Sequence, residues 1–143
     1  MIDAAVVDAS VGIKLFIEEP GSVEAEWLFS GLAASPPARF YIPDVFYIEC
    51  ANTLWKYVRR YGYSAENASS DIAALQALDL FTVSTADLLL LALELALEHD
   101  LSAYDACYAA LAQELDLPLI TADTNLARKL ARSEIEVVLL KDL

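Results

Sequence analysis

The sequence predicts an α/β fold: a three-layer α/β/α sandwich with a mostly parallel central sheet. Strand-like and helix-like segments alternate along the chain, and the strand-like segments are continuous apolar runs. Such runs are typical of parallel strands, because helices cover both faces of a parallel sheet. A length of 143 residues suits one domain, so we expect residues 1–143 to form a single domain.

The predicted strands are short and rich in apolar residues. They are residues 4–8, 39–43, 80–84, 118–123 and 135–140. The first strand, AAVVD, ends at Asp8, and the fourth, PLITAD, ends at Asp123. Both acids therefore stand where a strand gives way to a helix.

The remaining segments are predicted helices, with start and stop signals at several ends. Pro20 and Gly21 end the first helix and Gly62 ends the third, because proline lacks an N–H and glycine tolerates left-handed backbone. Ser64 and Ser102 are candidate N-caps. The helices are residues 10–19, 22–34, 44–62, 64–78, 85–100, 102–115 and 124–132.

Composition restricts the compartment and the partners. The apolar fraction of 57% exceeds the usual ~45–50%, which is compatible with an interface to another subunit or partner. The net charge of −13 gives no overall attraction for nucleic acid, but it attracts basic proteins.

Leu88–Leu93 is too short to span a bilayer, so we interpret it as part of a buried core helix. The N-terminus has no signal-peptide pattern, and Cys50 and Cys107 are too few for a disulfide scaffold, so we expect a reduced, cytoplasmic protein without a membrane segment.

Several familiar site types are excluded. His99 is the only histidine, so neither a Ser-His-Asp triad nor a Cys/His zinc site has enough residues. The four glycines are never grouped, so no glycine-rich phosphate loop is present.

Four acids are expected at one edge of the sheet. Asp8 and Asp123 end strands, Asp105 lies in the first turn of its helix, and Glu49 lies early in the helix 44–62. Strand C-termini and helix N-termini share one edge of a parallel α/β sheet, and ligands bind there. Carboxylates held together must protonate, separate or bind cations. Hard oxygen ligands select Mg²⁺ or Mn²⁺.

Each acid also has a structural explanation. Asp105 follows Ser102 by three residues, so SAYD is a candidate capping box in which the carboxylate bonds the N–H of Ser102. Asp8 and Asp123 are common N-cap types. Glu49 has no such structural explanation, because no basic residue lies one helical turn away to form an ion pair with it. The combination of acids therefore indicates a site more strongly than any single acid does.

The segments that carry the acids resemble the PIN-domain family, and within it the VapC-type toxin ribonucleases. They are VVDASV, PDVFYIECANTL, SAYDACYAALAQELDLPLITAD and IEVVLL, in the family's order along nearly the whole chain. The resemblance implies a PIN-like α/β/α domain and a divalent-metal-dependent endoribonuclease (a hydrolase). It also implies an RNA substrate, a small VapB-like antitoxin as partner, and a homodimer.

The resemblance assigns roles residue by residue. Asp8, Glu49, Asp105 and Asp123 correspond to the catalytic acids that hold one or two Mg²⁺ or Mn²⁺ ions. Ser10 and Thr121 correspond to hydroxyl residues beside the first and last acids. Where some members have a further acid, this chain has Asn125, which is expected to position water or the metal ligands.

Two alternatives remain open at this point. The same fold could serve RNA processing or DNA flap cleavage, or the chain could be a catalytically weak PIN-like scaffold that only binds a partner. The candidate RNA contacts are Lys14, Lys56, Arg59, Arg60, Arg128, Lys129 and Arg132, although solvated helix ends explain them equally well. The aromatic residues Tyr41, Phe46, Tyr47, Trp55 and Tyr57 are expected in the core or an interface rather than stacked on bases.

Overall fold

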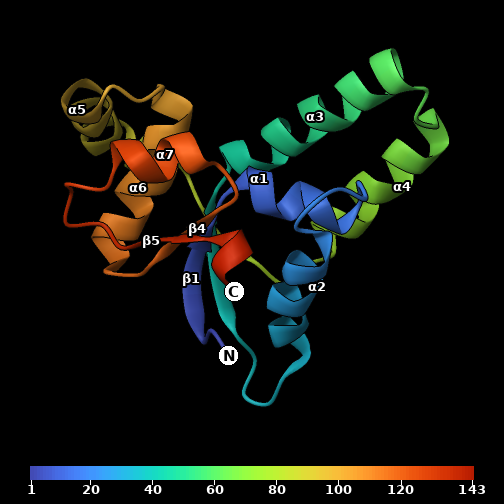
Figure 1. Ribbon diagram of the computed structural model, residues 1–143, viewed down its shortest axis with the longest axis horizontal. Helices are drawn as coiled ribbons and strands as arrows, with labels where there is room; N and C mark the ends of the chain where they lie inside the picture. Colours follow the sequence, from blue (N-terminus) through green and yellow to red (C-terminus); the bar gives the residue numbers. More distant parts are fainter.

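A five-stranded parallel sheet forms the centre of the computed structural model, which describes residues 1–143 (Figure 1). Across the sheet the order is β3 (Phe81–Val83), β2 (Arg39–Pro43), β1 (Ala4–Val7), β4 (Leu119–Thr121) and β5 (Val137–Leu139). Every neighbouring pair is parallel. The predicted α/β fold with a parallel central sheet is confirmed.

Seven α-helices connect and cover the strands. They are α1 (Ala9–Gly12), α2 (Ser22–Ser30), α3 (Val45–Tyr61), α4 (Ala65–Gln76), α5 (Leu89–His99), α6 (Ala103–Leu115) and α7 (Thr124–Lys129). Short 3₁₀ segments occur at Ile13–Leu15, Gly31–Ala33, Thr85–Asp87 and Leu140–Asp142. None of these helices combines the length and apolar character that crossing a bilayer requires.

Two apolar cores lie on opposite faces of the sheet, which makes the three layers. Alternate residues of β1 divide between them: Ala5 and Val7 pack with α2, whereas Val6 packs with α3 to α7. Figure 1 shows α3 and α4 projecting as an arm on one side, with α5, α6 and α7 grouped on the other.

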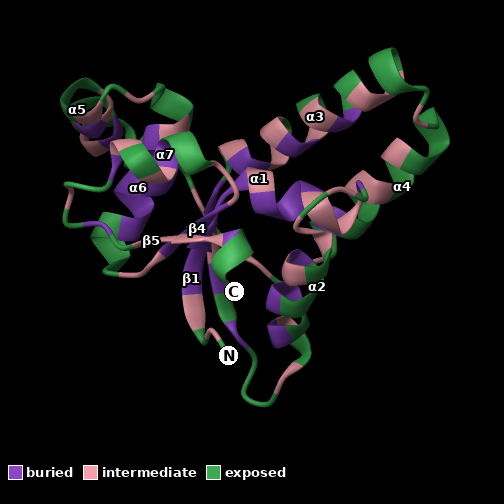
Figure 2. Cartoon of the chain, in the orientation of Figure 1, coloured by how far each residue is buried: buried purple, intermediate pink, exposed green.

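The helix α6 is the most deeply placed helix. Its residues from Ala106 to Ala112 are all buried, and α6 is purple beside its label in Figure 2. It lies between α5 and the sheet, and it contacts β1, β2 and β4. Asp105 therefore lies in the first turn of α6, one residue before the first buried residue of that helix.

The first predicted helix, residues 10–19, is wrong in its second half. The chain leaves α1 at Gly12, makes one 3₁₀ turn to Leu15 and then bends. The N–H groups of Phe16 and Ile17 both donate to the carbonyl of Ile13, at 3.0 Å each, so the helical ladder ends there. Pro20 disfavours helical backbone at the residue before it, which limits the helix from the other side.

The prediction of a buried core helix at Leu88–Leu93 is also wrong. Leu88 is buried, but Leu89, Leu90 and Leu93 are exposed, as is Leu97 one turn on. The physical reason is that α5 lies outside α6 and buries only one stripe, formed by Ala92 and Leu95. The leucine run therefore supplies a surface rather than a core.

Gly12 allows α1 to approach α3 closely. A Cβ atom built on Gly12 would lie 2.6 Å from Cζ and 2.8 Å from Cε2 of Phe46, a fully buried ring. The backbone of Gly12 therefore packs on the Phe46 ring, and this contact holds α1, which follows Asp8, against the start of α3.

We predict that Gly12→Ala destabilises the fold by about 1–3 kcal/mol through this overlap, although alanine is otherwise the better helix former by about 0.5–1 kcal/mol. Urea unfolding of the wild type, Gly12→Ala, Phe46→Leu and the double variant measures the coupling. The cost of Gly12→Ala should be smaller in the Phe46→Leu background. An equal or larger cost there would show that the ring is not the obstacle.

Candidate active site

Asp8 lies at the C-terminal end of the central strand β1, and its carboxylate is buried. Two hydroxyls donate to the same oxygen, Oδ2: Ser10 Oγ at 2.7 Å and Thr121 Oγ1 at 2.7 Å. Asp8 occupies the N-cap position of α1 but makes no side-chain cap bond, so the expected capping explanation is wrong for this residue. Burial raises the pKa of Asp8; the two hydroxyl bonds oppose this rise and the charge of Asp123 adds to it.

The same hydroxyls fasten α1 to the end of β4. Ser10 Oγ accepts from the N–H of Ala122 at 3.0 Å, and Thr121 Oγ1 accepts from the N–H of Asp123 at 3.0 Å. The two hydroxyl oxygens lie 3.3 Å apart. This network fixes Asp8 relative to Asp123, although the two residues are far apart in sequence.

Glu49 lies in the second turn of α3 and has a partner on α6. The hydroxyl of Tyr108 donates to Glu49 Oε1 at 2.8 Å. Burial raises the pKa of Glu49 to about 7; the Tyr108 bond opposes the rise, and the charges of Asp8 and Asp105 add to it. The protonation of Glu49 is therefore coupled to the charges of Asp8 and Asp105.

Asp105 forms only half of the predicted capping box. Ser102 Oγ accepts from the N–H of Asp105 at 3.1 Å, but the reciprocal bond from the N–H of Ser102 to the carboxylate is not formed. The carboxylate instead lines the cavity that contains the other acids. Burial raises the pKa of Asp105, and the charges of Asp8 and Asp123 raise it further.

Asp123 has the N-cap role that was expected, and it faces the same cavity. Its Oδ1 accepts from the N–H groups of Asn125 at 2.9 Å and Leu126 at 3.2 Å, at the start of α7. Three of the four carboxylates thus share one arrangement. Asp8, Glu49 and Asp123 each have one oxygen held by the protein, which orients the other.

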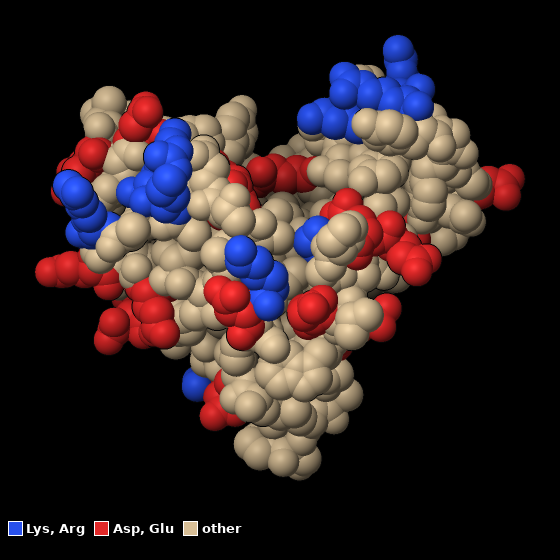
Figure 3. All heavy atoms as spheres, in the orientation of Figure 1, with Lys and Arg blue, Asp and Glu red and all other residues tan.

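A cavity of about 280 Å³ gathers these side chains at the C-terminal edge of the sheet. Its lining consists of Asp8, Ala9, Ser10, Ile13, Glu49, Asn52, Thr53, Lys56, Asp105 and Asp123. Thr121 lies behind it, in contact with Asp8. Figure 3 shows acidic atoms in the hollow between the two helical groups, with basic atoms above it on either side.

The donor set suits a hard divalent cation, because carboxylate and hydroxyl oxygens are the ligands that such ions prefer. No group of three or more Asp, Glu, His or Cys side chains is arranged closely enough to hold one ion. Like charges raise one another's pKa, and a bound cation would offset their repulsion. The residues that could hold a cation here are the four acids.

Residues 5–131 match the family model described as PIN domain.

The chain belongs to the PIN-domain family.

The resemblance seen in the sequence is therefore confirmed. Ribonuclease VapC3 of Pyrobaculum aerophilum is 37% identical over 128 residues, which cover 87% of this chain and 92% of that protein. A toxin-antitoxin complex from Klebsiella pneumoniae has a chain with TM-score 0.67 and 22% identity, covering 95% of this chain and 97% of that one. A crystal structure of VapBC2 from Rickettsia felis, bound to a DNA fragment from their promoter, gives TM-score 0.69 and 14% identity, covering 95% and 98%. At these identities the solved structures show a shared fold.

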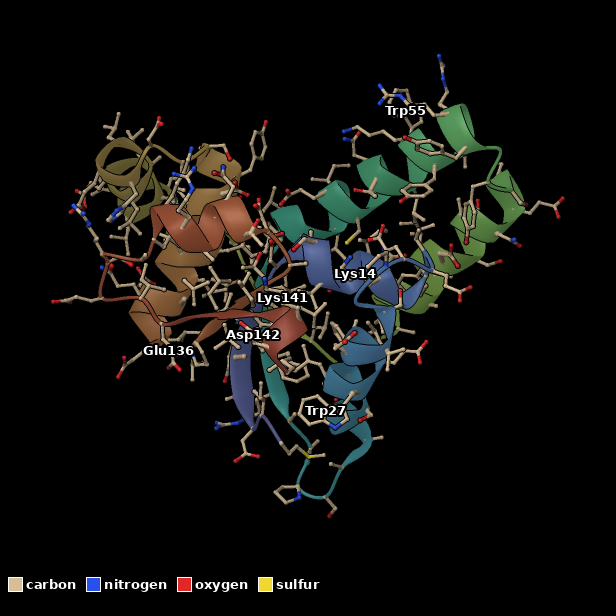
Figure 4. The ribbon with its side chains drawn as sticks, viewed as in Figure 1. Lys14, Trp27, Trp55, Glu136, Lys141 and Asp142 are labelled. Atoms are coloured by element: carbon tan, nitrogen blue, oxygen red, sulfur yellow. The ribbon has the colours of Figure 1, made fainter.

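Two residues named from the sequence lie outside the acidic cavity of the PIN domain. The Lys14 ammonium donates to Glu19 Oε1 and to the carbonyl of Pro20, both at 2.8 Å. Lys14 lies in the 3₁₀ segment Ile13–Leu15 and is labelled in Figure 4. The Asn125 side chain accepts a hydrogen bond from Arg128. Lys14 is therefore engaged by its own segment and Asn125 by Arg128, and the roles expected of them towards RNA and the ligands stay predictions.

Sequence reasoning missed Tyr108 and the cavity-lining role of Lys56. Tyr108 follows Asp105 by three residues, so both lie on one face of α6, and this spacing is the signal that could have identified it. The contact of Tyr108 with Glu49 depends on how α6 crosses α3, which no local pattern encodes.

We predict that the stability of this PIN domain without divalent ions falls as pH rises from about 4.5 towards 7. Folded Glu49 holds its proton up to a pKa of about 7, against 4.5 for an ordinary glutamate, so the folded state binds more protons in this window. The raised pKa values of Asp8 and Asp105 act in the same direction. Glu49→Gln should reduce the loss by on the order of 2 kcal/mol once solvent screening of this half-buried group is allowed for, measured by urea unfolding at pH 5 and pH 8.

Glu94→Gln, at an exposed position on α5, is the matched control for loss of one negative charge. Addition of Mg²⁺ at pH 8 should restore stability to the wild type more than to Glu49→Gln. An unchanged pH dependence in Glu49→Gln, or one equal to that of the Glu94→Gln control, contradicts the assignment.

Proposed function

We propose that this protein is a divalent-metal-dependent endoribonuclease and the toxin of a toxin–antitoxin pair. The observation that carries the proposal is the placement of four carboxylates, from four separate segments, around one cavity of a PIN domain. The relationship to Ribonuclease VapC3, at 37% identity, supports RNA as the substrate.

Asp8, Glu49, Asp105 and Asp123 would hold the ion, and Mg²⁺ or Mn²⁺ fits their oxygen donors. When bound, such an ion polarises a phosphate and lowers the pKa of water. The anchored oxygens of Asp8, Glu49 and Asp123 leave one oxygen of each carboxylate for a ligand. The fold therefore orients each of these three carboxylates before any ligand enters.

The protein's own residues orient and desolvate the site. Ser10 and Thr121 hold Asp8 in a single orientation, and Tyr108 does the same for Glu49. Lys56 brings a cation to the rim of the acidic cavity, where a substrate phosphate would lie.

Basic side chains near the cavity offset the negative charge of the chain locally. Figure 3 shows Lys and Arg atoms gathered over the outer part of α3 and over α7, on both sides of the acidic hollow. An RNA strand crossing the hollow would meet cations before and after the acids.

We infer that the cognate partner is a VapB-like antitoxin. Two structural neighbours are described as toxin–antitoxin or VapBC structures, and the acidic surface of this chain suits a basic partner segment. The leucines exposed on α5 suit the homodimer that the family resemblance implies. We also propose that residues 1–143 form a single domain and that the protein is cytoplasmic. Cys50 and Cys107 are free and buried, which suits a reducing compartment.

We predict that Asp8→Asn and Asp105→Asn each reduce RNA cleavage by at least ~100-fold, because each removes a ligand charge beside the reacting phosphate. Gel analysis of a fluorescent RNA with Mg²⁺ or Mn²⁺, and with EDTA as the metal-free control, measures the rate. Product strands should carry a 5′-phosphate and a 3′-hydroxyl.

Asp3→Asn is the matched control, since Asp3 precedes the same strand at the opposite edge of the sheet and is exposed. Circular dichroism should show all three variants folded. Metal-dependent cleavage retained by both Asp8→Asn and Asp105→Asn contradicts the proposed function.

We predict that induced expression of the wild type arrests bacterial growth and that expression of Asp8→Asn does not. Where a small DNA-binding protein is encoded directly upstream, its co-expression should restore growth. Colony counts after induction measure the effect. Normal growth with active enzyme would favour an RNA-processing role over a toxin.

A further inference from the structure

A second, larger depression adjoins the acidic cavity. It has a volume of about 760 Å³ and lies between α3 and the N-terminal end of α6. Glu49, Asn52 and Asp105 line both the groove and the cavity, so the two are continuous. A chain whose phosphate lies at the acids therefore extends directly into this groove.

Large side chains on both walls of the groove are exposed. Ile48 and Trp55 on α3 are 65% and 53% exposed, and Tyr104 on α6 is 63% exposed. The two aromatic residues come from different helices and line one groove. Of the two places expected for Trp55, the core is excluded, because α3 buries only Phe46, Cys50 and Leu54.

The charge beside the groove indicates the kind of ligand. The Arg59 guanidinium lies 5.4 Å from the centroid of the Trp55 ring, a cation–π distance. Lys56 lines the adjoining cavity, and Arg60 follows on the same helix. In a chain of net charge −13, this local cluster favours a polyanion and disfavours a basic peptide.

We propose that Trp55 and Tyr104 stack with the nucleobases that flank the phosphate at the acidic cavity. The proposal rests on the proposed ribonuclease function and assigns two aromatic residues of the groove to base contact. In a duplex the bases stack on one another, whereas in loops and single strands their faces are open to aromatic side chains. Arg59, on the Trp55 ring, supplies a cation for the neighbouring phosphate.

The test measures binding of fluorescein-labelled single strands by anisotropy. All proteins carry Asp8→Asn, so that the RNA is not cleaved. One probe is a short oligouridylate and the other is an abasic strand with the same backbone. The variants are Trp55→Ala, Tyr104→Ala and their combination, with Trp55→Phe and Tyr104→Phe as ring-preserving variants.

Trp27→Ala is the matched control for loss of an exposed tryptophan. Trp27 lies on α2 and is 44% exposed, and Figure 4 shows it at the opposite end of the molecule from Trp55. Each alanine substitution in the groove should weaken binding of the base-bearing strand by about 5- to 100-fold. Binding of the abasic strand should remain unchanged, and the phenylalanine variants should retain most of the affinity.

Two outcomes overturn the stacking proposal: equal loss of affinity for both strands, and no loss for either. A double alanine variant that binds RNA normally but changes from dimer to monomer in sedimentation assigns the groove to a second copy instead. A failure of the proposed function is distinguishable. It would appear as no cleavage by the wild-type protein while the preference for base-bearing strands, and its loss on alanine substitution, persist.

Discussion

The buried carboxylate of Asp8, bound through one oxygen by two hydroxyls, is the contact on which the site depends. Asp8 is only 5% exposed at the end of the central strand, and a carboxylate in that position is costly without hydrogen bonds. Thr121 supplies one bond from the neighbouring strand β4, and Ser10 supplies the other from the first turn of α1. The register of β1 with β4 and the position of α1 are therefore tied to the geometry of a single charged group.

The other acids extend this arrangement into a cluster under electrostatic strain. Glu49 and Asp105 each have a raised pKa, to which the charge of Asp8 contributes. The fold holds one oxygen of Asp8, Glu49 and Asp123 while leaving the repulsion among the four acids unrelieved. Such a cluster costs stability at neutral pH, and a bound cation would offset that cost, so the proposed ion site and the loss of stability involve the same residues.

The convergence of the acids was predictable because it follows from a topological rule. In a parallel α/β sheet, strand C-termini and helix N-termini meet at one edge, and Asp8, Asp123 and Asp105 hold such positions in the sequence. The bond between Tyr108 and Glu49 was not predictable, since it depends on the crossing of α6 and α3. The exposed leucines of α5 were missed for a similar reason. A run of leucines indicates a helix, but the packing partners decide how much of its surface is buried.

We propose that Asp8, Glu49, Asp105 and Asp123 together form a divalent-cation site whose protons must leave before the ion can bind. Calorimetric titration of Mn²⁺ into the wild-type protein, repeated in buffers of different ionisation enthalpy, measures the ion affinity and the protons released at once. Near pH 7, where Glu49 is about half protonated, binding should release a fraction of a proton or more, and at pH 9 almost none. Absence of binding, or binding without proton release near pH 7, would contradict the account.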